Sequence, residues 1–303
     1  MSCAAALQPA TEDSFCVFGF SFVLRTNHPE SRDAFVRLYR QFESSIDAET
    51  AIEAVFRSQG DEFRWQLGEK TGRASDVRGA LWGLESALCE ATLRSQQRLI
   101  AIHAATIYSR DSAVMLVGPS GAGKSTLSVA LSRRGFTLAT DDVALVDPNT
   151  LTVHPIPRCV HLDRQSVLLL EAECFHLPET WKRFSFLAPV DLDSRPIPQC
   201  GAGLLIYIAG PRAQRSRLKP VSQSEMAARL LSETGQGPLT DSENVAVFSR
   251  MSSSAACFHL IPGSLSETAD LVAALILRHQ YAPAGSKVEG IERSGKRPWR
   301  PRM

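Results

Sequence analysis

The feature that most constrains this chain is a short glycine-rich segment that follows an apolar run. Residues 118–125 read Gly-Pro-Ser-Gly-Ala-Gly-Lys-Ser, a G-x-x-x-x-G-K-S pattern, and the apolar residues 113–117 come directly before them. Glycines let the backbone curl so that successive N–H groups converge on phosphate oxygens. A helix that begins at the lysine directs its partial positive charge at the same anion. The segment therefore predicts a strand, a phosphate-binding loop and a helix.

The side chains of this loop have separate expected roles. The Lys124 ammonium is expected on the terminal phosphates of a nucleotide, and the Ser125 hydroxyl is expected to ligate Mg²⁺. A glycine-rich surface turn without a ligand is the competing interpretation, and the strand before the loop and the helix after it disfavour that interpretation. The expected nucleotide contacts are Gly118, Pro119, Ser120, Gly121, Ala122, Gly123, Lys124, Ser125 and Thr126.

Composition narrows the class of protein. The chain has 303 residues, a net charge of +1 and 44% hydrophobic residues, which is an ordinary globular balance. This charge gives no argument for a nucleic-acid or membrane-surface partner. No apolar run is long enough to span a membrane, and we find no signal peptide. The seven cysteines are scattered without C-x-x-C spacing, which favours a reducing compartment, so we expect a cytoplasmic protein.

Three parts are expected along the chain. Residues 1–97 predict a small α+β accessory or substrate-docking domain, which includes one strand over residues 16–24. Residues 98–281 predict an α/β domain that holds the phosphate-binding loop. Residues 282–303 form a basic tail without apolar periodicity, and we expect it to be disordered.

The second part predicts a mixed sheet. Residues 99–108 read as one strand, and the turn-type residues 109–112 connect it to the strand that precedes the loop. These two strands are expected to form a hairpin, which would make the sheet partly antiparallel. A basic run after residue 211 (Arg212, Arg215, Arg217 and Lys219) is expected to be a solvated loop, with an acidic or phosphate partner as the alternative.

A pair of aspartates is the second chemical signal. Asp141 and Asp142 end the apolar segment that follows the loop helix, and that segment must return the chain toward the phosphates. One carboxylate would help hold Mg²⁺, and the other would accept the proton of an attacking hydroxyl. A solvated Asp-Asp turn is the alternative. His103 lies in an apolar strand, where a histidine is more often a core residue than a catalyst.

The order of these motifs resembles the catalytic domain of the HPr kinase/phosphorylase family, whose nucleotide fold is shared with phosphoenolpyruvate carboxykinase. The resemblance rests on His103-Ala104-Ala105, on the loop at 118–126 and on residues 134–143, which contain the aspartate pair. It implies a mixed-sheet P-loop kinase core, with Asp141 as general base, Asp142 toward Mg²⁺ and His103 at the active site. The sequence does not fix which aspartate has which role. The family's glycine-containing signature is replaced by residues 154–162, in which Arg158 either stabilises transferred-phosphate charge or is a structural or solvated arginine.

The sequence therefore favours an ATP-dependent, Mg²⁺-dependent kinase that phosphorylates a serine or similar hydroxyl of a peptide or protein. The alternative is a nucleotide-binding regulatory module without transfer activity. A transport ATPase is disfavoured because residues 231–237 do not supply its serine-glycine-glycine-glutamine signature. The identity of the acceptor and the formation of a homo-oligomer stay open.

Overall fold

The computed structural model describes two compact units within one chain. Contacts divide the chain into a first unit (Met1–Gln97 with Pro178–Ala188) and a second unit (Arg98–Leu177 with Pro189–Met303). Residues 178–188 thus group with the first unit, although we expected them in the second part. The described residues are 11–45, 51–59, 62–110, 112–156, 158–173, 175–178, 181–182, 186–192, 199–210, 212–235 and 239–281. The tail expected over residues 282–303 lies outside them.

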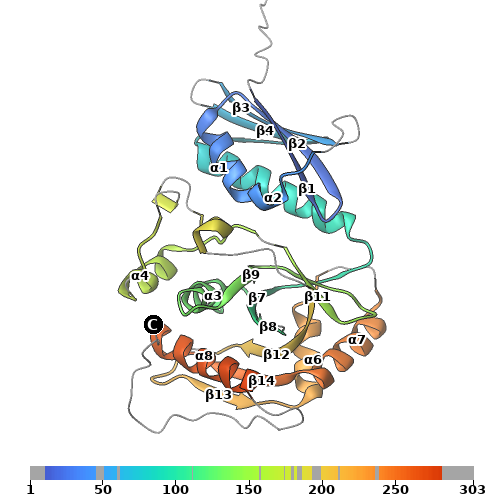
Figure 1. Cartoon of the computed structure of the whole chain (residues 1–303), viewed down its shortest axis with the longest axis vertical. Coiled ribbons are helices and arrows are strands. Elements are labelled where there is room, and N and C mark those ends of the chain that lie inside the picture. The colour runs from blue at the N-terminus through green and yellow to red at the C-terminus, as the bar shows by residue number, and fades with distance from the viewer. Residues whose placement is uncertain are drawn as a thin grey trace, which may run out of the picture. The chain divides into compact units, whose positions relative to one another are not determined.

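In the described residues, the first unit contains a five-stranded sheet, two α-helices and a 3-10 helix over Arg40–Phe42 (Figure 1). Each strand pairs with the next one along the chain, and only the pairing of the second with the third strand is parallel. The helices are α1 (Pro29–Tyr39) and α2 (Val77–Ser95), and the Asp76 carboxylate caps α2 by accepting the Gly79 N–H. The strands are β1 (Thr11–Val17), β2 (Phe20–Thr26), β3 (Ile52–Gln59), β4 (Glu62–Leu67) and β5 (Lys70–Ala74).

The first hairpin corrects a sequence-based expectation. We expected one strand over residues 16–24, but the chain reverses at Phe18 and Gly19, whose φ angles are 51° and 81°. Two consecutive positive φ angles are typical of a type I′ turn, which matches the twist of antiparallel strands. Phenylalanine is a rare residue in such a turn, so the aromatic run concealed it.

The second unit is a mixed α/β structure around a nine-stranded sheet. Strand β12 pairs in parallel with β8 and β14, while all other described pairings of this sheet are antiparallel. Its helices are α3 (Lys124–Ser132), α4 (Arg164–Ala172), α6 (Gln223–Ser232), α7 (Asp241–Ser254) and α8 (Leu265–Tyr281). Its strands are β6 (Ile100–Ile102), β7 (Ala104–Ser109), β8 (Ser112–Val117), β9 (Thr137–Thr140), β10 (Ala144–Val146), β11 (Thr152–Pro155), β12 (Cys200–Ile208), β13 (Arg217–Pro220) and β14 (Ala256–Ile261).

Helices cover both faces of the central strands, which explains why these strands are continuously apolar. Met115 and Val117 of β8 belong to a core cluster with Phe248 and Met251 of α7 and with α6. Because side chains alternate along a strand, the residues between them on β8 point to the opposite face of the sheet. On that face α3 packs against β7, β8 and β9 and also contacts α8. The mixed sheet that the sequence predicted is confirmed.

The expected hairpin is also confirmed, but its first strand is interrupted. Strand β7 pairs antiparallel with β8, and Ser109 lies opposite Ser112 beside the turn. The single strand expected over residues 99–108 is two strands, because β6 pairs with β10 whereas β7 pairs with β8 and β9. His103 is the residue between them. The chain therefore passes from one part of the sheet to another at this histidine.

The basic run that we expected to be a solvated loop is partly a strand. Residues Arg217–Pro220 form β13 at the edge of the sheet, where they pair with β14 and bury Leu218. Arg217 and Lys219 alternate with Leu218 and are exposed, and lysine on an edge strand discourages further strand pairing.

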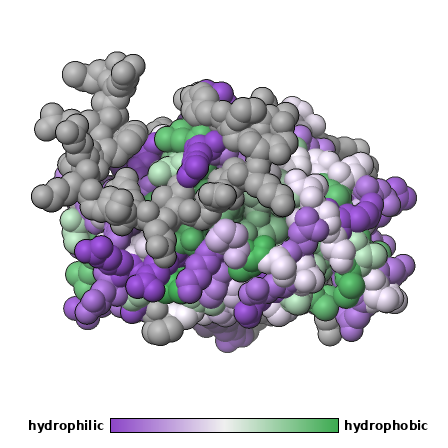
Figure 2. Space-filling model, turned by 90° about the horizontal axis from the view of Figure 1, so that it is seen from below, coloured by the Kyte–Doolittle hydropathy of each residue, from purple (hydrophilic) through white to green (hydrophobic). Residues whose placement is uncertain are grey.

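None of the described helices combines the length and the apolarity that crossing a membrane requires. Figure 2 shows one face of the molecule, on which hydrophilic and hydrophobic residues alternate in small patches.

Close packing of Trp65 in the first unit gives a test of this fold. A Cβ atom placed on Gly83 of α2 would lie 2.3 Å from Trp65 Nε1, so glycine is required although alanine favours a helix by about 1 kcal/mol. We expect Gly83→Ala to lower the free energy of unfolding by about 1–3 kcal/mol in urea denaturation. The loss should shrink in a Trp65→Phe background. A more stable Gly83→Ala protein would contradict this packing.

Candidate functional site

Three strand ends meet at one edge of the sheet in the second unit. Strands β8 and β9 are both antiparallel to β7, so they run in the same direction and their carboxyl ends lie together. The start of β7 lies at the same edge, since Ala104 is opposite Val117. His103, the glycine-rich loop and the aspartate pair, which lie far apart in the sequence, are thereby brought together.

Three glycines of the glycine-rich loop have positive φ angles. The φ angles of Gly118, Gly121 and Gly123 are 150°, 78° and 91°. A Cβ atom on Gly118 would lie 2.3 Å from the Ile208 carbonyl oxygen, so no other residue fits there. Gly123 caps α3, and the Ala122 N–H closes a turn on the Pro119 carbonyl at 3.1 Å. The first N–H groups of α3 therefore face the inside of the loop.

Lys124 is held by the loop itself. The side chain is buried, and its Nζ donates to the carbonyl oxygens of Gly118 at 2.6 Å and Pro119 at 3.1 Å. Burial lowers the pKa of Lys124, while the nearby carboxylates of Glu233, Asp141 and Asp142 act against that shift. Lysine carbonyl contacts of this kind are exchangeable, because a polyphosphate is a stronger acceptor for the ammonium.

A tight turn over residues 141–143, directly after β9, places the two aspartate side chains in different environments. The Val143 N–H donates to the Asp141 carbonyl at 2.9 Å, and the Thr140 hydroxyl donates to the Val143 carbonyl at 2.7 Å. Asp142 has a left-handed backbone with φ of 73°, a conformation that aspartate tolerates better than most residues. Its carbonyl accepts the Ala104 N–H at 3.2 Å, which ties the turn to the start of β7.

Asp141 is a buried acid. Only 4% of the residue is exposed, and this burial raises its pKa to about 6 despite a hydrogen bond from Ser125. Its Oδ1 atom has no hydrogen-bond partner among the residues that the structure describes. A buried carboxylate with an unpartnered oxygen beside a hydroxyl is an incomplete set of oxygen ligands, which a hard cation such as Mg²⁺ would complete.

Asp142 has the opposite environment. Its side chain is 54% exposed, with Oδ1 lying 3.2 Å from His103 Nε2 and Oδ2 lying 2.8 Å from Arg158 Nη1. The hydrogen bond with His103 and the charge of Arg158 lower the pKa of Asp142 to about 2. Asp142 is therefore an accessible and ionised carboxylate held between two nitrogen donors.

One site residue escaped the sequence analysis. Glu233 follows the last turn of α6, and its Oε2 atom lies 3.5 Å from His103 Nδ1. Its side chain is 10% exposed. Glu233 lies in the segment 231–237, and no local pattern in the sequence marks it as a site residue.

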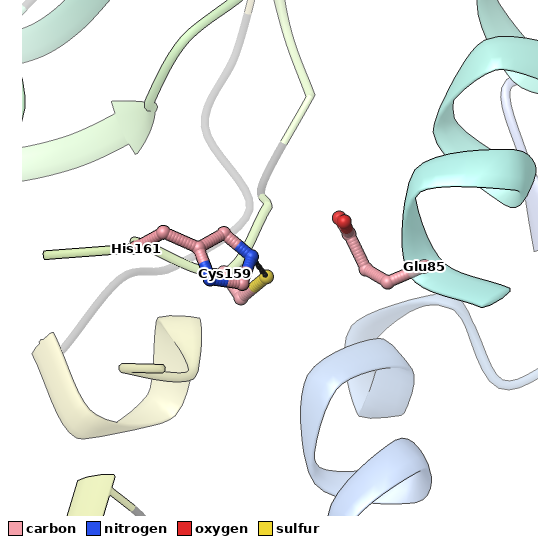
Figure 3. A group of neighbouring side chains, drawn as sticks. All are labelled: Glu85, Cys159 and His161. Atoms are coloured by element: carbon pink, nitrogen blue, oxygen red, sulfur yellow. Dashed lines mark hydrogen bonds between the residues drawn. The ribbon is translucent and has the colours of Figure 1, made fainter. Parts of the chain in front are cut away.

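Other predicted site residues have structural contacts. The buried Thr126 hydroxyl donates to the Ser166 hydroxyl of α4 at 2.7 Å, so this side chain joins α3 to α4. Arg158 is followed by Cys159, whose Sγ lies 3.1 Å from His161 Nε2 (Figure 3). This sulfur–imidazole contact joins two residues of the segment that follows Arg158.

A separate pocket of about 400 Å³ lies at the other end of α3. It is bounded by the turn after this helix, which contains Arg134 and Phe136, and by the face of α8 that carries Ala274 and Leu277. The Arg134 guanidinium is already engaged there by Asp270 at 2.9 Å. This pocket is distinct from the edge at which the predicted site residues gather.

Comparisons with known proteins give a distant structural likeness. No protein-family model matches the chain, and no curated protein matches its sequence. A solved structure of the Hpr(Ser) kinase/phosphatase from Coxiella burnetii is 15% identical over 59% of this chain and 90% of that chain, with a TM-score of 0.31. A likeness this weak carries no functional conclusion.

The contrast between the two aspartates predicts that their variants differ in how stability changes with pH in metal-free protein. Because folding raises the pKa of Asp141 from 3.8 to about 6, the folded state binds this proton more tightly, and its stability falls as the pH rises from about 4 to 6. Asp141→Asn removes this loss. We expect its stability advantage over the wild type to grow by about 1–2 kcal/mol between pH 5 and pH 7.5, in urea denaturation with a chelator.

Asp142→Asn is the matched control. The pKa of Asp142 is lowered to about 2, so its own contribution to stability is complete above pH 5. The variant should therefore show a much smaller change over the same interval, which comes from removing the Asp142 charge that helps raise the pKa of Asp141. An equal pH dependence in both variants would show that Asp141 is not a strained buried acid.

Proposed function

We propose that the chain is an ATP-dependent phosphotransferase of the HPr-kinase type, which phosphorylates a serine or similar hydroxyl of a peptide or protein. The observation that carries the proposal is that the two adjacent aspartates at the end of β9 have different environments. One aspartate is buried beside the Ser125 hydroxyl, and the next is exposed between His103 and Arg158. A site that only binds a nucleotide needs the first arrangement but not the second.

The donor half would be formed by the loop and α3. The loop N–H groups and the start of α3 suit phosphate oxygens, and Lys124 would leave the loop carbonyls for the terminal phosphates. Ser125 and Asp141 are the residues that would hold Mg²⁺, because both offer hard oxygen ligands and one Asp141 oxygen lacks a partner. When bound, Mg²⁺ supplies charge neutralisation at the phosphoryl oxygens.

The acceptor half would be formed by Asp142. This carboxylate stays ionised at neutral pH and is open to solvent, so it is suited to accept the proton of a substrate hydroxyl. Phosphoryl transfer depends mostly on positioning and electrostatic stabilisation, so a weakly basic but well-held carboxylate is adequate. Arg158 would stabilise negative charge on the transferred group. The geometry thus favours Asp142 as base and Asp141 toward the metal, the reverse of the roles that the resemblance implied.

Three sequence-based expectations stay predictions. These are the docking role of residues 1–97, the cytoplasmic location, and an acceptor that is a peptide or protein rather than a small molecule. The regulatory module without transfer activity is the competing function, and the same assay separates the two.

The assay follows label from γ-³²P-ATP onto peptides and proteins co-expressed with the chain. We expect transfer by the wild type, and a loss of about 100-fold or more for Lys124→Ala and for Asp142→Asn. Asp142→Asn should bind ATP normally, whereas Asp141→Asn should lose the response to Mg²⁺. Asp147→Asn is the matched control, because this carboxylate accepts the Asn149 and Thr150 N–H groups of its own turn and lies outside the proposed site.

Two outcomes would contradict the proposal. Full activity of Asp142→Asn would remove its proposed role as base. Tight ATP binding by the wild type without label on any acceptor would favour the regulatory module.

A further inference from the structure

Glu233 occupies a position that local rules disfavour. It caps the carboxyl end of α6, where the helix dipole favours cations over anions. Its side chain is 10% exposed, so the carboxylate also loses much of its hydration. A residue that breaks two local rules at once is expected where function requires it.

Backbone contacts already join this part of the chain to the strand that carries His103. The His103 N–H donates to the Glu233 carbonyl oxygen at 2.8 Å, and Ile102 and Thr234 form a bridge beside it. The Thr234 hydroxyl donates to the Leu230 carbonyl at 2.7 Å, and Leu230 is completely buried. The Glu233 side chain is therefore not needed to attach α6 to the sheet, and its carboxylate calls for another explanation.

The carboxylate faces two groups of the proposed site. It lies 3.5 Å from His103 Nδ1, while the other ring nitrogen of His103 lies 3.2 Å from Asp142. Glu233 also makes the largest charge contribution that opposes the lowered pKa of Lys124. It thus lies on the side of His103 that faces away from Asp142, within electrostatic reach of the loop lysine.

We propose that Glu233 is a positioning residue, whose carboxylate holds the His103 imidazole so that Nε2 is presented to Asp142. His103 needs such a support because it lies at the break between β6 and β7, outside the regular ladder of either strand. Partners of this kind fix the orientation of the ring, here with one carboxylate beside each ring nitrogen. The inference rests on the proposed phosphotransferase function, but the orientation of His103 can be measured independently of it.

The first test is spectroscopic and requires no activity. Long-range ¹H–¹⁵N NMR spectra report whether the Nδ1 atom of His103 carries a proton, and a His103→Gln variant assigns its signals. In Glu233→Ala we expect the Nδ1 signal to move toward the unprotonated range. Glu233→Gln retains an acceptor oxygen and should keep the signal near that of the wild type. If Glu233→Ala does not fold, Glu233→Asp should produce the same shift, because its carboxylate is one methylene shorter.

The second test is kinetic. We expect Glu233→Ala to lower kcat on the order of 10-fold with the KM for ATP within about twofold of the wild type, and Glu233→Gln to recover most of the loss. Glu225→Gln is the matched control, since this glutamate lies on the first turn of the same helix and pairs with the exposed Arg229.

The outcomes separate the two proposals. An unchanged His103 spectrum in Glu233→Ala or Glu233→Asp would overturn the positioning role, whatever the activity. A shifted spectrum in a protein that transfers no phosphate would support the positioning role and refute the proposed function. Equal kinetic losses in Glu233→Gln and Glu233→Ala would also count against positioning.

Discussion

The left-handed turn at Asp142 is the constraint on which the site depends. Adjacent carboxylates normally share one environment and raise each other's pKa. Here the turn after β9 directs Asp141 into the protein beside Ser125 and leaves Asp142 exposed between His103 and Arg158. Their pKa values separate to about 6 and about 2 as a result. Two chemically identical side chains therefore differ in how tightly they bind a proton and in how accessible they are to solvent.

The sheet supplies the setting for this turn. Because β7 lies between β8 and β9 and is antiparallel to both, the loop after β8 and the turn after β9 emerge at the same edge. The interruption at His103 then lets a third group enter from the start of β7, and the Asp142 carbonyl is bonded to the Ala104 N–H. The end of α6 completes the cluster with Glu233. Figure 1 shows α3 and strands β7, β8 and β9 grouped in the second unit.

Local signals were predictable from sequence, and long-range ones were not. The loop needs glycine where φ is positive and where the Ile208 carbonyl approaches Gly118. Because these requirements fix residue types at fixed spacing, the loop could be predicted from the sequence. The hairpin before the loop was predictable for a different reason, because the turn-type residues 109–112 lie between two apolar runs. The first hairpin was missed because Phe18 takes a turn position usually held by asparagine or glycine. Glu233 was missed because only the packing of α6 brings it to His103. Helix α7 was missed for another reason: its start is marked by a local signal, the capping box of Thr240 and Glu243, which the sequence analysis did not use.

The central claim is that the two aspartates serve different partners. A crystal structure of the chain with Mg²⁺ and a non-hydrolysable ATP analogue tests it most directly. We expect the metal beside the Ser125 hydroxyl and the Asp141 carboxylate, with Asp142 still held by His103 and Arg158. A metal bound by Asp142, with Asp141 buried and uninvolved, would contradict it.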